Sequence, residues 1–362
     1  MGGAQADAAF RGCIGIVLGL TRHAKCAYIG RMSFLDRHLR IEPIDVYIDP
    51  MTPRGRVIIT HGHADHARAG HGQVLATADT IAIMKSRYGE DCAGSFQALA
   101  FGEPLDIDGV EVTLLPAGHI LGSAQVRLRH RGETIVVTGD YKRLADRTAQ
   151  AFELVQCDIL VTEATFGLPV FQHPKPQDEI RRLLKSVADN PERAHLIGAY
   201  SLGKTQRVIS LLREGGYDRP IYLHGAMLEL CALYEQRGIA LGPLVPVLEV
   251  GKAALAGGIV IAPPSALKDR WSRRLPDPVL AMASGWMSVK QRARQSGVEL
   301  PLVISDHADW NELRQTIIDT GAAEVWVTHG REDALVYWCQ QQGLAATPLN
   351  IVGYGEGGEG GE

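Results

Sequence analysis

The segment THGHADHARAGHG, residues 60–72, constrains this chain more than any other, because it places four histidines and an aspartate directly behind the apolar run RVIIT. Imidazole nitrogen and carboxylate oxygen are the ligands that zinc and related divalent ions prefer. Side chains two residues apart in an extended segment point the same way, so His61 and His63 can reach one ion. Asp65 and His66 can serve a second ion where, we expect, the chain turns into a helix. One such segment cannot fill two coordination spheres, so further ligands must come from distant parts of the chain.

The remaining candidate ligands lie where predicted strands end. From Val46 onward, short runs rich in β-branched residues alternate with turns, which predicts a strand-rich layer. Such patterns precede His119 in PAGHILGSA, Asp140 in TGDYKR and His329 in VTHGRE. Because rigid scaffolds commonly carry functional groups on the loops they hold, we expect these side chains to join the first four, with Asp140 shared by two ions. His71 falls outside the spacing, and we interpret it as a loop residue.

The order of patterns predicts one domain inserted into another. A strand-rich part comes first, strands and helices then alternate from about residue 174, and strands ending in histidine return near the end of the chain. Alternation of this kind favours a parallel sheet with covering helices. We therefore expect an unassigned leader (1–31), a first domain in two parts (32–172 and 299–352), an inserted β/α domain (173–298) and a disordered Gly/Glu tail (353–362).

Composition is that of a globular protein with no general attraction to polyanions. The 362 residues are 46% apolar, enough for a large core, and the formal net charge is −4. Any nucleic acid would therefore be held by local basic patches or by metal. The six cysteines form no C-x-x-C pair, which indicates reduced core thiols in a cytoplasmic protein. The apolar run IGIVLGL at residues 14–20 is too short to span a bilayer, and we expect no membrane association.

A competing motif is GAYSLGKT at residues 198–205, which satisfies the phosphate-binding pattern G-x-x-x-x-G-K-[ST] between a predicted strand and a predicted helix. A nucleotide hydrolase also needs a strand that ends in a magnesium-binding acid, whereas the following strands, PIYLHGA and GGIVIAPP, end in histidine or proline. We interpret this helix start, with Lys204 and Arg207, as an anion site for a nucleic-acid phosphate. The alternative is a glycine turn with solvated basic residues.

A basic stretch from Lys268 to Arg294 carries seven lysines and arginines with two tryptophans among them. Basic groups interleaved with aromatic rings suit single-stranded nucleic acid, whose backbone needs neutralising and whose bases can stack. Arg273 and Trp286 are the candidates for these contacts. The alternative is a charged face that only meets solvent.

The motifs in their order along the chain resemble those of a known fold. They are YIDP, HADHAR, GHILGSAQ, TGDYKR, TEATFG, AYSLGKTQR, SDHADW and HGRE. They resemble the metallo-β-lactamase fold and its β-CASP branch of nucleic-acid-processing nucleases. Within that branch they look most like bacterial ligase-associated DNA damage response exonucleases, also labelled messenger-RNA 3′-end-processing-like proteins, from about residue 41 to 352. The resemblance implies an α/β protein with an αββα sandwich, an inserted β-CASP domain and two divalent ions, zinc or manganese.

Carried over residue by residue, the resemblance also implies a ligand set. One ion would be held by His61, His63 and His119. The other would be held by Asp65, His66 and His329, with Asp140 bridging the two. Two ions about 3.5–4 Å apart can stabilise both the attacking and the leaving oxygen of a phosphoester displacement.

The catalytic groups follow from the same resemblance. Asp65 counts among them as well as among the ligands, and Asp49 would orient a ligand histidine. His307 would donate a proton to the leaving oxygen, with Glu163 orienting it. Gly62 departs from the alanine or threonine common at that position, which we expect to loosen the loop.

The expected function is therefore a two-metal phosphodiesterase on nucleic acid, a DNA exonuclease in DNA repair, with DNA favoured over RNA and with a DNA ligase and helicase as partners. An RNA-processing nuclease of the same branch is one alternative. A thioesterase- or lactamase-like hydrolase is another, although it would not need the insert, Glu163 or His307. A metal-bound scaffold without turnover would be marked by missing ligands, and none is missing here. Polarity of digestion, exo or endo action, the metal in the cell and the oligomeric state stay open.

Overall fold

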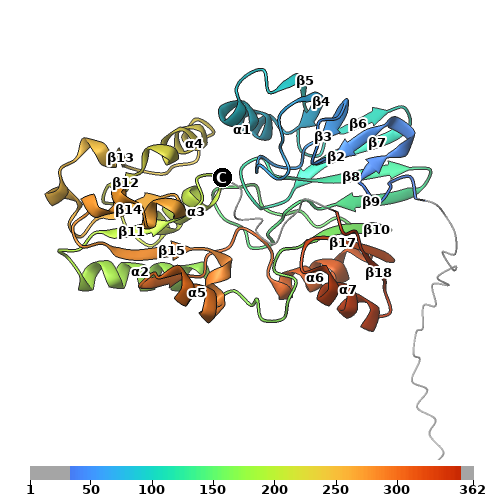
Figure 1. Cartoon of the computed structure of the whole chain (residues 1–362). Helices are drawn as coiled ribbons and strands as arrows, with labels where there is room; N and C mark the ends of the chain where they lie inside the picture. Colours follow the sequence, from blue (N-terminus) through green and yellow to red (C-terminus); the bar gives the residue numbers. More distant parts are fainter. Residues whose placement is uncertain (1–32, 352–362) are drawn as a thin grey trace, which may run out of the picture. The chain divides into compact units, whose positions relative to one another are not determined.

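Three β-sheets with covering helices organise the part of the chain that the computed structural model describes, residues 33–351 (Figure 1). The α/β class predicted from the sequence is confirmed. The predicted leader, residues 1–31, and the predicted tail, residues 353–362, lie outside the described residues. Within the described range, every helix is too short or too polar to cross a bilayer.

The first sheet has five strands in chain order, and every neighbouring pair except the first is parallel. Its strands are β1 (Arg40–Ile41), β2 (Val46–Ile48), β3 (Arg56–Ile58), β4 (His71–Ala76) and β5 (Ala93–Ala98). Helix α1 (Ala78–Tyr88) follows β4 and packs Ile81 and Met84 against Val57. Thr77 caps this helix by accepting a hydrogen bond from the Thr80 N–H at 3.1 Å.

The second sheet has seven strands in the order β18-β17-β10-β9-β8-β7-β6, parallel from β18 to β9 and antiparallel beyond. Its strands are β6 (Pro104–Ile107), β7 (Val110–Pro116), β8 (Ala124–His130), β9 (Glu133–Val137), β10 (Ile159–Ala164), β17 (Glu324–Gly330) and β18 (Ala345–Pro348). The parallel half brings the carboxyl ends of β9, β10 and β17 to one edge, which is where side chains for a shared site can meet.

The two sheets face each other across an apolar core. Ile58 of the first sheet is buried in one cluster with Val126 and Ile135 of the second. On the outer face of the second sheet, two helices bury Leu313 and Leu335 in one cluster with Leu160 of β10 and Val325 of β17. These helices are α6 (Trp310–Thr320) and α7 (Glu332–Gln341). The layers therefore run helix, sheet, sheet, helix, as the sandwich prediction requires, with α1 on one side and α6 and α7 on the other (Figure 1).

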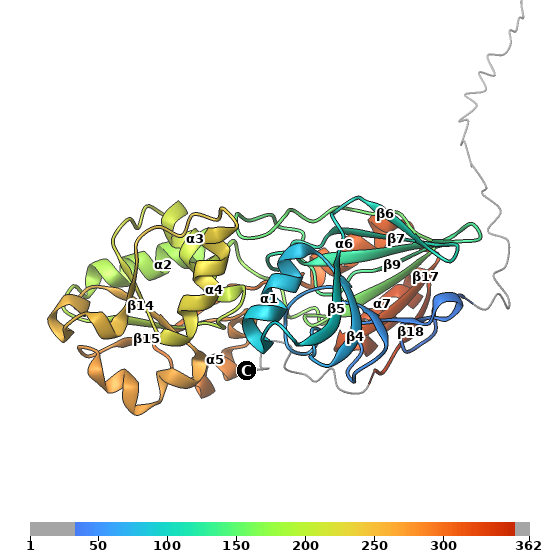
Figure 2. The same cartoon turned by 90° about the horizontal axis from the view of Figure 1, so that it is seen from above.

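The third sheet belongs to the insert and is wholly parallel, in the order β13-β12-β14-β11-β15-β16. Its strands are β11 (His195–Gly198), β12 (Ile221–Leu223), β13 (Leu244–Pro246), β14 (Ile259–Ala262), β15 (Val279–Ala283) and β16 (Leu300–Leu302). One face carries α2 (Pro176–Asp189), α3 (Lys204–Glu214) and α4 (Gly225–Gln236), of which α3 and α4 lie side by side in Figure 2. The predicted boundary at residue 298 falls before β16, which extends this sheet to Leu302.

The insert contacts the first sandwich layer through α1 and α4. Ser86 donates a hydrogen bond to Glu229 at 2.7 Å, and Arg237 pairs with Asp79 at 3.1 Å. Ile83 of α1 is buried in the apolar cluster that α3 and α4 form on the third sheet. The insert is thus packed against the part of the chain that carries the first histidines.

The strand-rich part and the part with alternating strands and helices, both expected from the sequence, are present in the structure. They contain β2, β3, β7 to β12, β14, β17, α2, α3 and α4. Helix α1 is not predicted, because most of its apolar residues form one consecutive run, residues 81–84, and few recur over the rest of the helix. Strand β5 is not predicted either, because AGSFQA has neither alternation nor a buried run.

Candidate active site

Four side chains of the first predicted ligand group converge although they come from three separate loops. His61, His63, His119 and Asp140 each offer a ligand atom, and these atoms all lie within 4.8 Å of one another. The Nε2 atom of His119 is 3.0 Å from Nδ1 of His63, and Nε2 of His61 is 3.4 Å from Oδ2 of Asp140. Ring nitrogens and a carboxylate oxygen gathered this closely are arranged as ligands around a common point.

The second predicted group, Asp65, His66 and His329, forms a neighbouring cluster within the same 4.8 Å limit. The rings of His66 and His329 stack with centroids 4.5 Å apart. Oδ2 of Asp140, already part of the first cluster, lies 3.4 Å from Nε2 of His66. Asp140 therefore stands between the two clusters, as expected of a bridging carboxylate.

Asp49 connects one histidine of each cluster, His66 directly and His61 through Thr60. Its Oδ2 accepts hydrogen bonds from His66 Nδ1 at 2.8 Å and from the Thr60 hydroxyl at 2.5 Å. The Thr60 oxygen in turn lies 3.1 Å from Nδ1 of His61. Because the Nδ1 atoms of His61 and His66 are held by Thr60 and Asp49, their Nε2 atoms are directed toward Asp140. Hydrogen bonds of this kind fix the ring orientation of metal-binding histidines.

The backbone between the histidines differs from the sequence expectation in two respects. No helix begins at Asp65. The chain makes a single turn in which the His63 carbonyl accepts from the N–H groups of His66 (3.1 Å) and Ala67 (2.8 Å), because β4 follows too soon for a helix. His71 is not a loop residue. It begins β4, is 1% exposed, and accepts a hydrogen bond at Nδ1 from the Arg54 N–H at 3.1 Å.

Gly62 does not loosen the segment. A Cβ atom at this position would lie 2.4 Å from Cγ2 of Ile83, so the loop between the two ligand histidines is pressed against α1. A glycine here permits close packing.

Glu163 and His307 form a buried pair beside the clusters. Nδ1 of His307 donates to Oε2 of Glu163 at 2.9 Å, and Oε1 of Glu163 accepts from the Tyr141 N–H at 2.6 Å. Each side chain of the pair is 1% exposed, and Nδ1 of His307 is 3.9 Å from Oδ2 of Asp140. The predicted acid and its orienting carboxylate are therefore adjacent to the predicted bridging ligand.

Burial dominates the electrostatics of the site. It lowers the pKa of His61, and the neighbouring His66 lowers it further. Burial likewise lowers the pKa of His119, and it lowers the pKa of His329 to about 4. These rings are therefore neutral at pH 7, which is the metal-binding form of imidazole. Burial also raises the pKa of Glu163, although His307 opposes this shift.

Two other groups are shifted by their neighbours. Burial lowers the pKa of His66, but the charges of Asp140, Asp65 and Asp49 outweigh it and raise the pKa well above its ordinary value. Burial raises the pKa of Asp140, and His66 and His307 bring it well below its usual range. Both shifts have the same cause, which is the attraction between the His66 ring and the carboxylates around it.

The donor set fits a pair of divalent ions. Five histidines and two aspartates gather in the two clusters. Nε2 of His61 and Oδ1 of Asp140 are buried and have no hydrogen-bond partner among residues 33–351. Buried polar atoms are nearly always satisfied, so two such atoms in one nitrogen- and oxygen-lined cluster indicate a place for cations.

Backbone conformation supports a functional origin for this arrangement. Asp49 and His329 have left-handed backbones, with φ of 46° and 56°. Non-glycine residues in this region carry strain, which persists where surrounding structure demands a particular side-chain direction. In both cases that direction is toward the clusters.

The structure contradicts the predicted phosphate contacts of Lys204 and Arg207. They are 0% and 1% exposed. Lys204 pairs with Asp306 at 3.0 Å, and Arg207 pairs with Asp306 at 3.0 Å and with Asp146. Burial raises the pKa of Asp306, but Lys204 and Arg207 together bring it below its ordinary range. These cations are already neutralised inside the protein, so an incoming phosphate cannot reach them.

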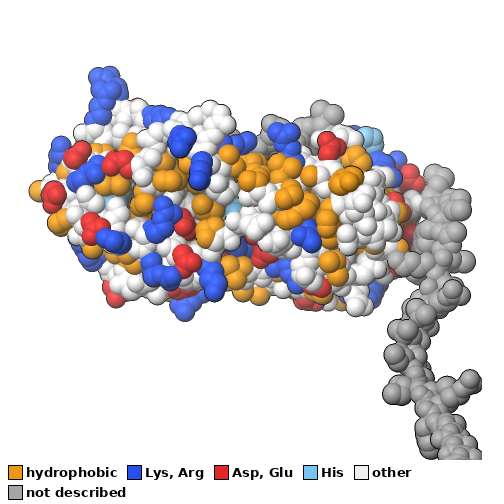
Figure 3. Space-filling view, turned by 90° about the horizontal axis from the view of Figure 1, so that it is seen from below, with side chains coloured by type: hydrophobic (Ala, Val, Ile, Leu, Met, Phe, Trp, Pro, Cys, Tyr) orange, Lys and Arg blue, Asp and Glu red, His pale blue; other side chains and the backbone are white. Residues whose placement is uncertain are grey.

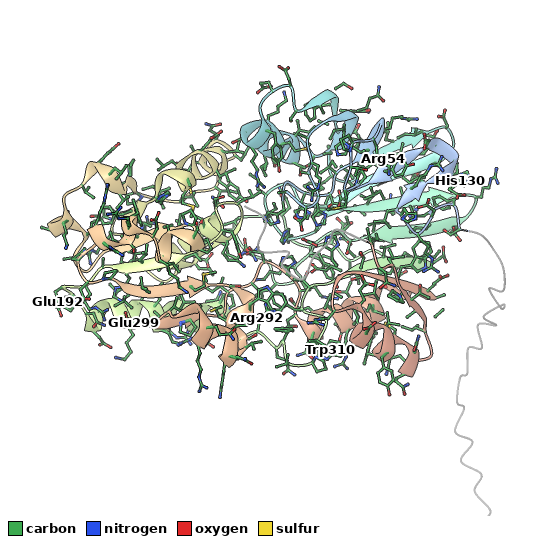
Figure 4. The ribbon with its side chains drawn as sticks, viewed as in Figure 1. Arg54, His130, Glu192, Arg292, Glu299 and Trp310 are labelled. Atoms are coloured by element: carbon green, nitrogen blue, oxygen red, sulfur yellow. The ribbon has the colours of Figure 1, made fainter. Side chains whose placement is uncertain are left out.

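Arg273 and Trp286 keep access to solvent. Arg273 is exposed in a 3₁₀ turn (Arg270–Arg274). Trp286 is half-buried, its ring centroid 4.9 Å from that of Phe166, which is 6.0 Å from that of His307. The guanidinium of Arg292, labelled in Figure 4, lies 4.0 Å from the centre of the Trp286 ring. A line of rings therefore leads from His307 to the basic stretch.

Sequence reasoning overlooked three residues that support the site. The Thr60 hydroxyl lies between Asp49 and His61 and contacts both. The Leu202 carbonyl lies 3.4 Å from His63 Nε2, and the Asp306 carbonyl accepts a hydrogen bond from His119 Nδ1 at 2.9 Å. Asp306 carries a signal in the sequence, since it directly precedes His307. Leu202 carries none, because a backbone oxygen leaves no trace in residue type.

Comparison with known proteins identifies relatives, although no family model matches the chain. A protein named "Probable DNA ligase" from Opitutus terrae is 32% identical over 308 residues, covering 83% of this chain and 29% of that protein. "RNase aCSPSF2" from Saccharolobus solfataricus is 30% identical over 38% of this chain and 28% of the relative. "Cleavage and polyadenylation specificity factor 73" from Drosophila melanogaster is 30% identical over 38% of this chain and 22% of the relative.

The chain spans less than a third of the length of each of these three relatives. Their names point to DNA in one case and to RNA in the others.

Proposed function

Because the chain belongs to the β-CASP branch of the metallo-β-lactamase fold, we propose that it is a metal-dependent nuclease that hydrolyses phosphodiester bonds with two ions. The observation that carries this proposal is the position of Asp140. Its Oδ2 is within 3.4 Å of one histidine from each ligand cluster, and it also groups with Glu163 and His307. Asp140 therefore belongs both to the predicted metal ligands and to the group formed with Glu163 and His307.

The ions would be held by the two clusters already described. When bound, two divalent ions supply a nucleophile at neutral pH and neutralise charge on the phosphate. Burial keeps His61 and His119 neutral and ready to bind. Asp49 holds the rings of His61 and His66 in position, the first through Thr60.

Proton transfer falls to the buried pair. Glu163 accepts hydrogen bonds from His307 Nδ1 and from the Tyr141 N–H, so the ring of His307 is fixed in orientation. Its Nε2 can then give a proton to the departing sugar oxygen. A thioester would have no use for this pair, because a thiolate leaves without being protonated.

We favour DNA over RNA as the substrate, with exonuclease action in DNA repair. The support is the relative that aligns over 83% of this chain and carries a DNA ligase name, which also makes a DNA ligase the expected partner. A helicase partner rests on the resemblance of the sequence motifs alone. We place the protein in the cytoplasm because its six cysteines form no dense disulfide framework. The two relatives with RNA-related names align over 38% each, so an RNA-processing nuclease is the competing outcome.

The substrate strand is proposed to cross the basic stretch next to Trp286. Figure 3 shows Lys and Arg side chains over the face that carries α2 and α5 (Lys290–Ser296). Arg273 would contact backbone phosphates, and the Trp286 ring would stack on a base near the leaving side.

One experiment addresses activity and substrate together. Purified protein loaded with zinc or manganese would be given 5′- and 3′-labelled DNA and RNA of the same sequence, single- and double-stranded, with a thioester as a third substrate. We expect stepwise shortening of DNA from one end and no thioester hydrolysis. A metal-loaded sample inert on DNA and RNA alike would remove the proposal, and faster cleavage of RNA would correct the substrate.

Trp286→Ala and Trp286→Phe test the proposed strand path. Removal of one stacking ring weakens binding by about 1–3 kcal/mol, so Trp286→Ala should raise KM on single strands while Trp286→Phe restores most of the affinity. Equal KM values in all three proteins would place the strand elsewhere.

A further inference from the structure

Arg207 joins two loops that come from distant parts of the chain. Its Nη2 donates to the carbonyl oxygens of His119 at 2.9 Å and Gly118 at 3.4 Å. Its Nη1 donates to the carbonyl oxygen of Ser305 at 2.9 Å. A guanidinium is a rigid planar fork. One side chain therefore sets the spacing between the loop of a ligand histidine and the loop of His307.

Asp306 is held to the same helix. Its Oδ2 lies 3.0 Å from Lys204 Nζ, and its Oδ1 lies 3.0 Å from Arg207 Nη1. Its backbone carbonyl accepts the hydrogen bond from His119 Nδ1 at 2.9 Å. The residue that precedes the proposed acid is thus tied both to α3 and to a ligand histidine.

The start of α3 also fits closely against the metal site. Gly203 has φ of 82°, and a Cβ atom there would lie 2.4 Å from Cγ2 of Ile120. The carbonyl of Leu202 lies 3.4 Å from Nε2 of His63. The helix cannot shift along its axis without moving the backbone around both histidine loops.

We propose that Lys204, Arg207 and Asp306 form a buried clamp through which the insert positions His307 against His119. This clamp deepens the proposed nuclease function and rests on it, because it concerns the geometry of that reaction. The pattern at residues 198–205 is then the base of the clamp, with its lysine turned inward to a carboxylate of the protein. All three are positioning residues, since none of them reaches the reacting atoms.

The kinetic test compares two leaving groups in the full-length, metal-loaded protein. A single-stranded oligonucleotide has a sugar hydroxyl as leaving group, which needs protonation, whereas the p-nitrophenyl ester of thymidine 5′-monophosphate does not. Misplacement of a catalytic group by about 1 Å can cost 10²-fold, so Lys204→Met should lower kcat on the oligonucleotide by about that factor. Its kcat on the ester should fall much less than its kcat on the oligonucleotide, and His307→Ala should show the same order of losses.

A structural test needs neither substrate nor ion. Hydrogen–deuterium exchange of the metal-free protein should be faster in Lys204→Met at residues 117–120 and 303–308, and unchanged in β12 and β14. Its outcome is independent of whether the protein is a nuclease.

Arg213 provides a matched control on the same helix. It too binds backbone carbonyls, those of Leu241 at 2.8 Å and Pro243 at 2.9 Å, but at the opposite end of α3 from the clamp. Arg213→Met should leave both kcat values and the exchange of the two catalytic loops unchanged.

Equal loss on the two substrates, or native exchange in both loops, would overturn the clamp. Should Lys204→Met fail to fold, Lys204→Arg keeps the charge while altering the reach, and the same comparison decides. Native protein that cleaves no nucleic acid would overturn the proposed function, and the exchange experiment would then still decide the clamp.

Discussion

The segment at residues 61–66 and the segment at residues 198–205 both follow a strand and both carry a pattern typical of ligand binding. In the first, the side chains of His61, His63 and His66 turn toward Asp140, a residue from another strand end. In the second, Lys204 turns into the protein and meets Asp306. The difference teaches that a ligand-binding pattern has its usual meaning only where its polar atoms are left for a ligand.

The reason for the difference lies in the neighbours. The first segment is surrounded by residues that hold each ring by one nitrogen and leave the other, as Asp49 and Thr60 do. The second segment is surrounded by carboxylates and carbonyls, and Lys204 binds the Ile304 carbonyl and Asp306. The same environment uses every donor of Arg207, just beyond the segment, except Nε. The following predictions test whether the two segments differ in this way.

The largest expected effect comes from Asp140→Ala. Asp140 lies between the two ligand clusters and next to the pair Glu163 and His307, so the substitution removes a residue that all three groups share. Metal ions contribute several kcal/mol to such reactions, so nuclease activity should fall by roughly 10³-fold or more. Bound metal, measured by inductively coupled plasma mass spectrometry, should fall with it. Asp158, which directly precedes β10 and accepts a hydrogen bond from the Thr134 N–H, provides the control Asp158→Ala. Full metal content in Asp140→Ala would refute the shared role.

A second prediction tests whether the segment GAYSLGKT, residues 198–205, has a structural role or binds a nucleotide. Removing one partner of a buried ion pair costs about 3–5 kcal/mol, so Lys204→Ala should lower the free energy of unfolding by that amount. Urea denaturation measures this loss. ATP with magnesium should not raise the melting temperature of the native protein, and a clear rise would restore the nucleotide-binding interpretation.

His307→Ala should lower kcat on DNA by at least about 10²-fold while leaving metal content unchanged, because a general acid acts on the leaving group and holds no ion. Steady-state kinetics and metal analysis on one sample measure both. His224→Ala serves as the matched control, since His224 caps α4 in the insert. Loss of metal in His307→Ala would make this residue a ligand instead.

Asp49→Ala should weaken metal binding by about 10–100-fold, because partners behind ligand histidines contribute on that scale. Titration with a competing chelator gives the affinity. Asp45 has a left-handed backbone as well but is exposed and pairs with Arg40, so Asp45→Ala should bind metal normally. Equal affinities in both variants would show that ring orientation does not need Asp49.

The smallest expected effect concerns the surface. When a protein gives up one phosphate of a single strand, the slope of log K against log salt becomes shallower by about 0.7. Arg273→Ala should show this shallower slope in fluorescence anisotropy with catalytically inactive protein. Arg181→Ala, where the arginine already pairs with Asp178, should not. Identical slopes would remove Arg273 from the strand path.

Much of the fold could be predicted because its strands and helices carry local patterns. The apolar positions of α2, Ile180, Leu183 and Val187, are buried at the spacing that predicts a helix. Helix α6 begins directly after Asp309, which forms a capping box with Glu312, a pattern readable from the sequence. Helix α1 and strand β5 have no such pattern, and only packing on the neighbouring strands holds them in place.

The sequence by itself determined which residues have the chemistry for the site. His61, His63, Asp65 and His66 are grouped by spacing, and the residue types at the later strand ends complete the donor set, because imidazole and carboxylate groups have few other reasons to cluster behind apolar runs.

Only the tertiary structure decided how these groups are used. It brought the ends of β3, β9, β10 and β17 together, gave Asp140 its place between the clusters, and turned Lys204 and Arg207 inward to hold the loops of His119 and His307. The physical reason is that burial and hydrogen-bond partners depend on residues far away in the chain, and a local pattern contains no information about which way a side chain will face.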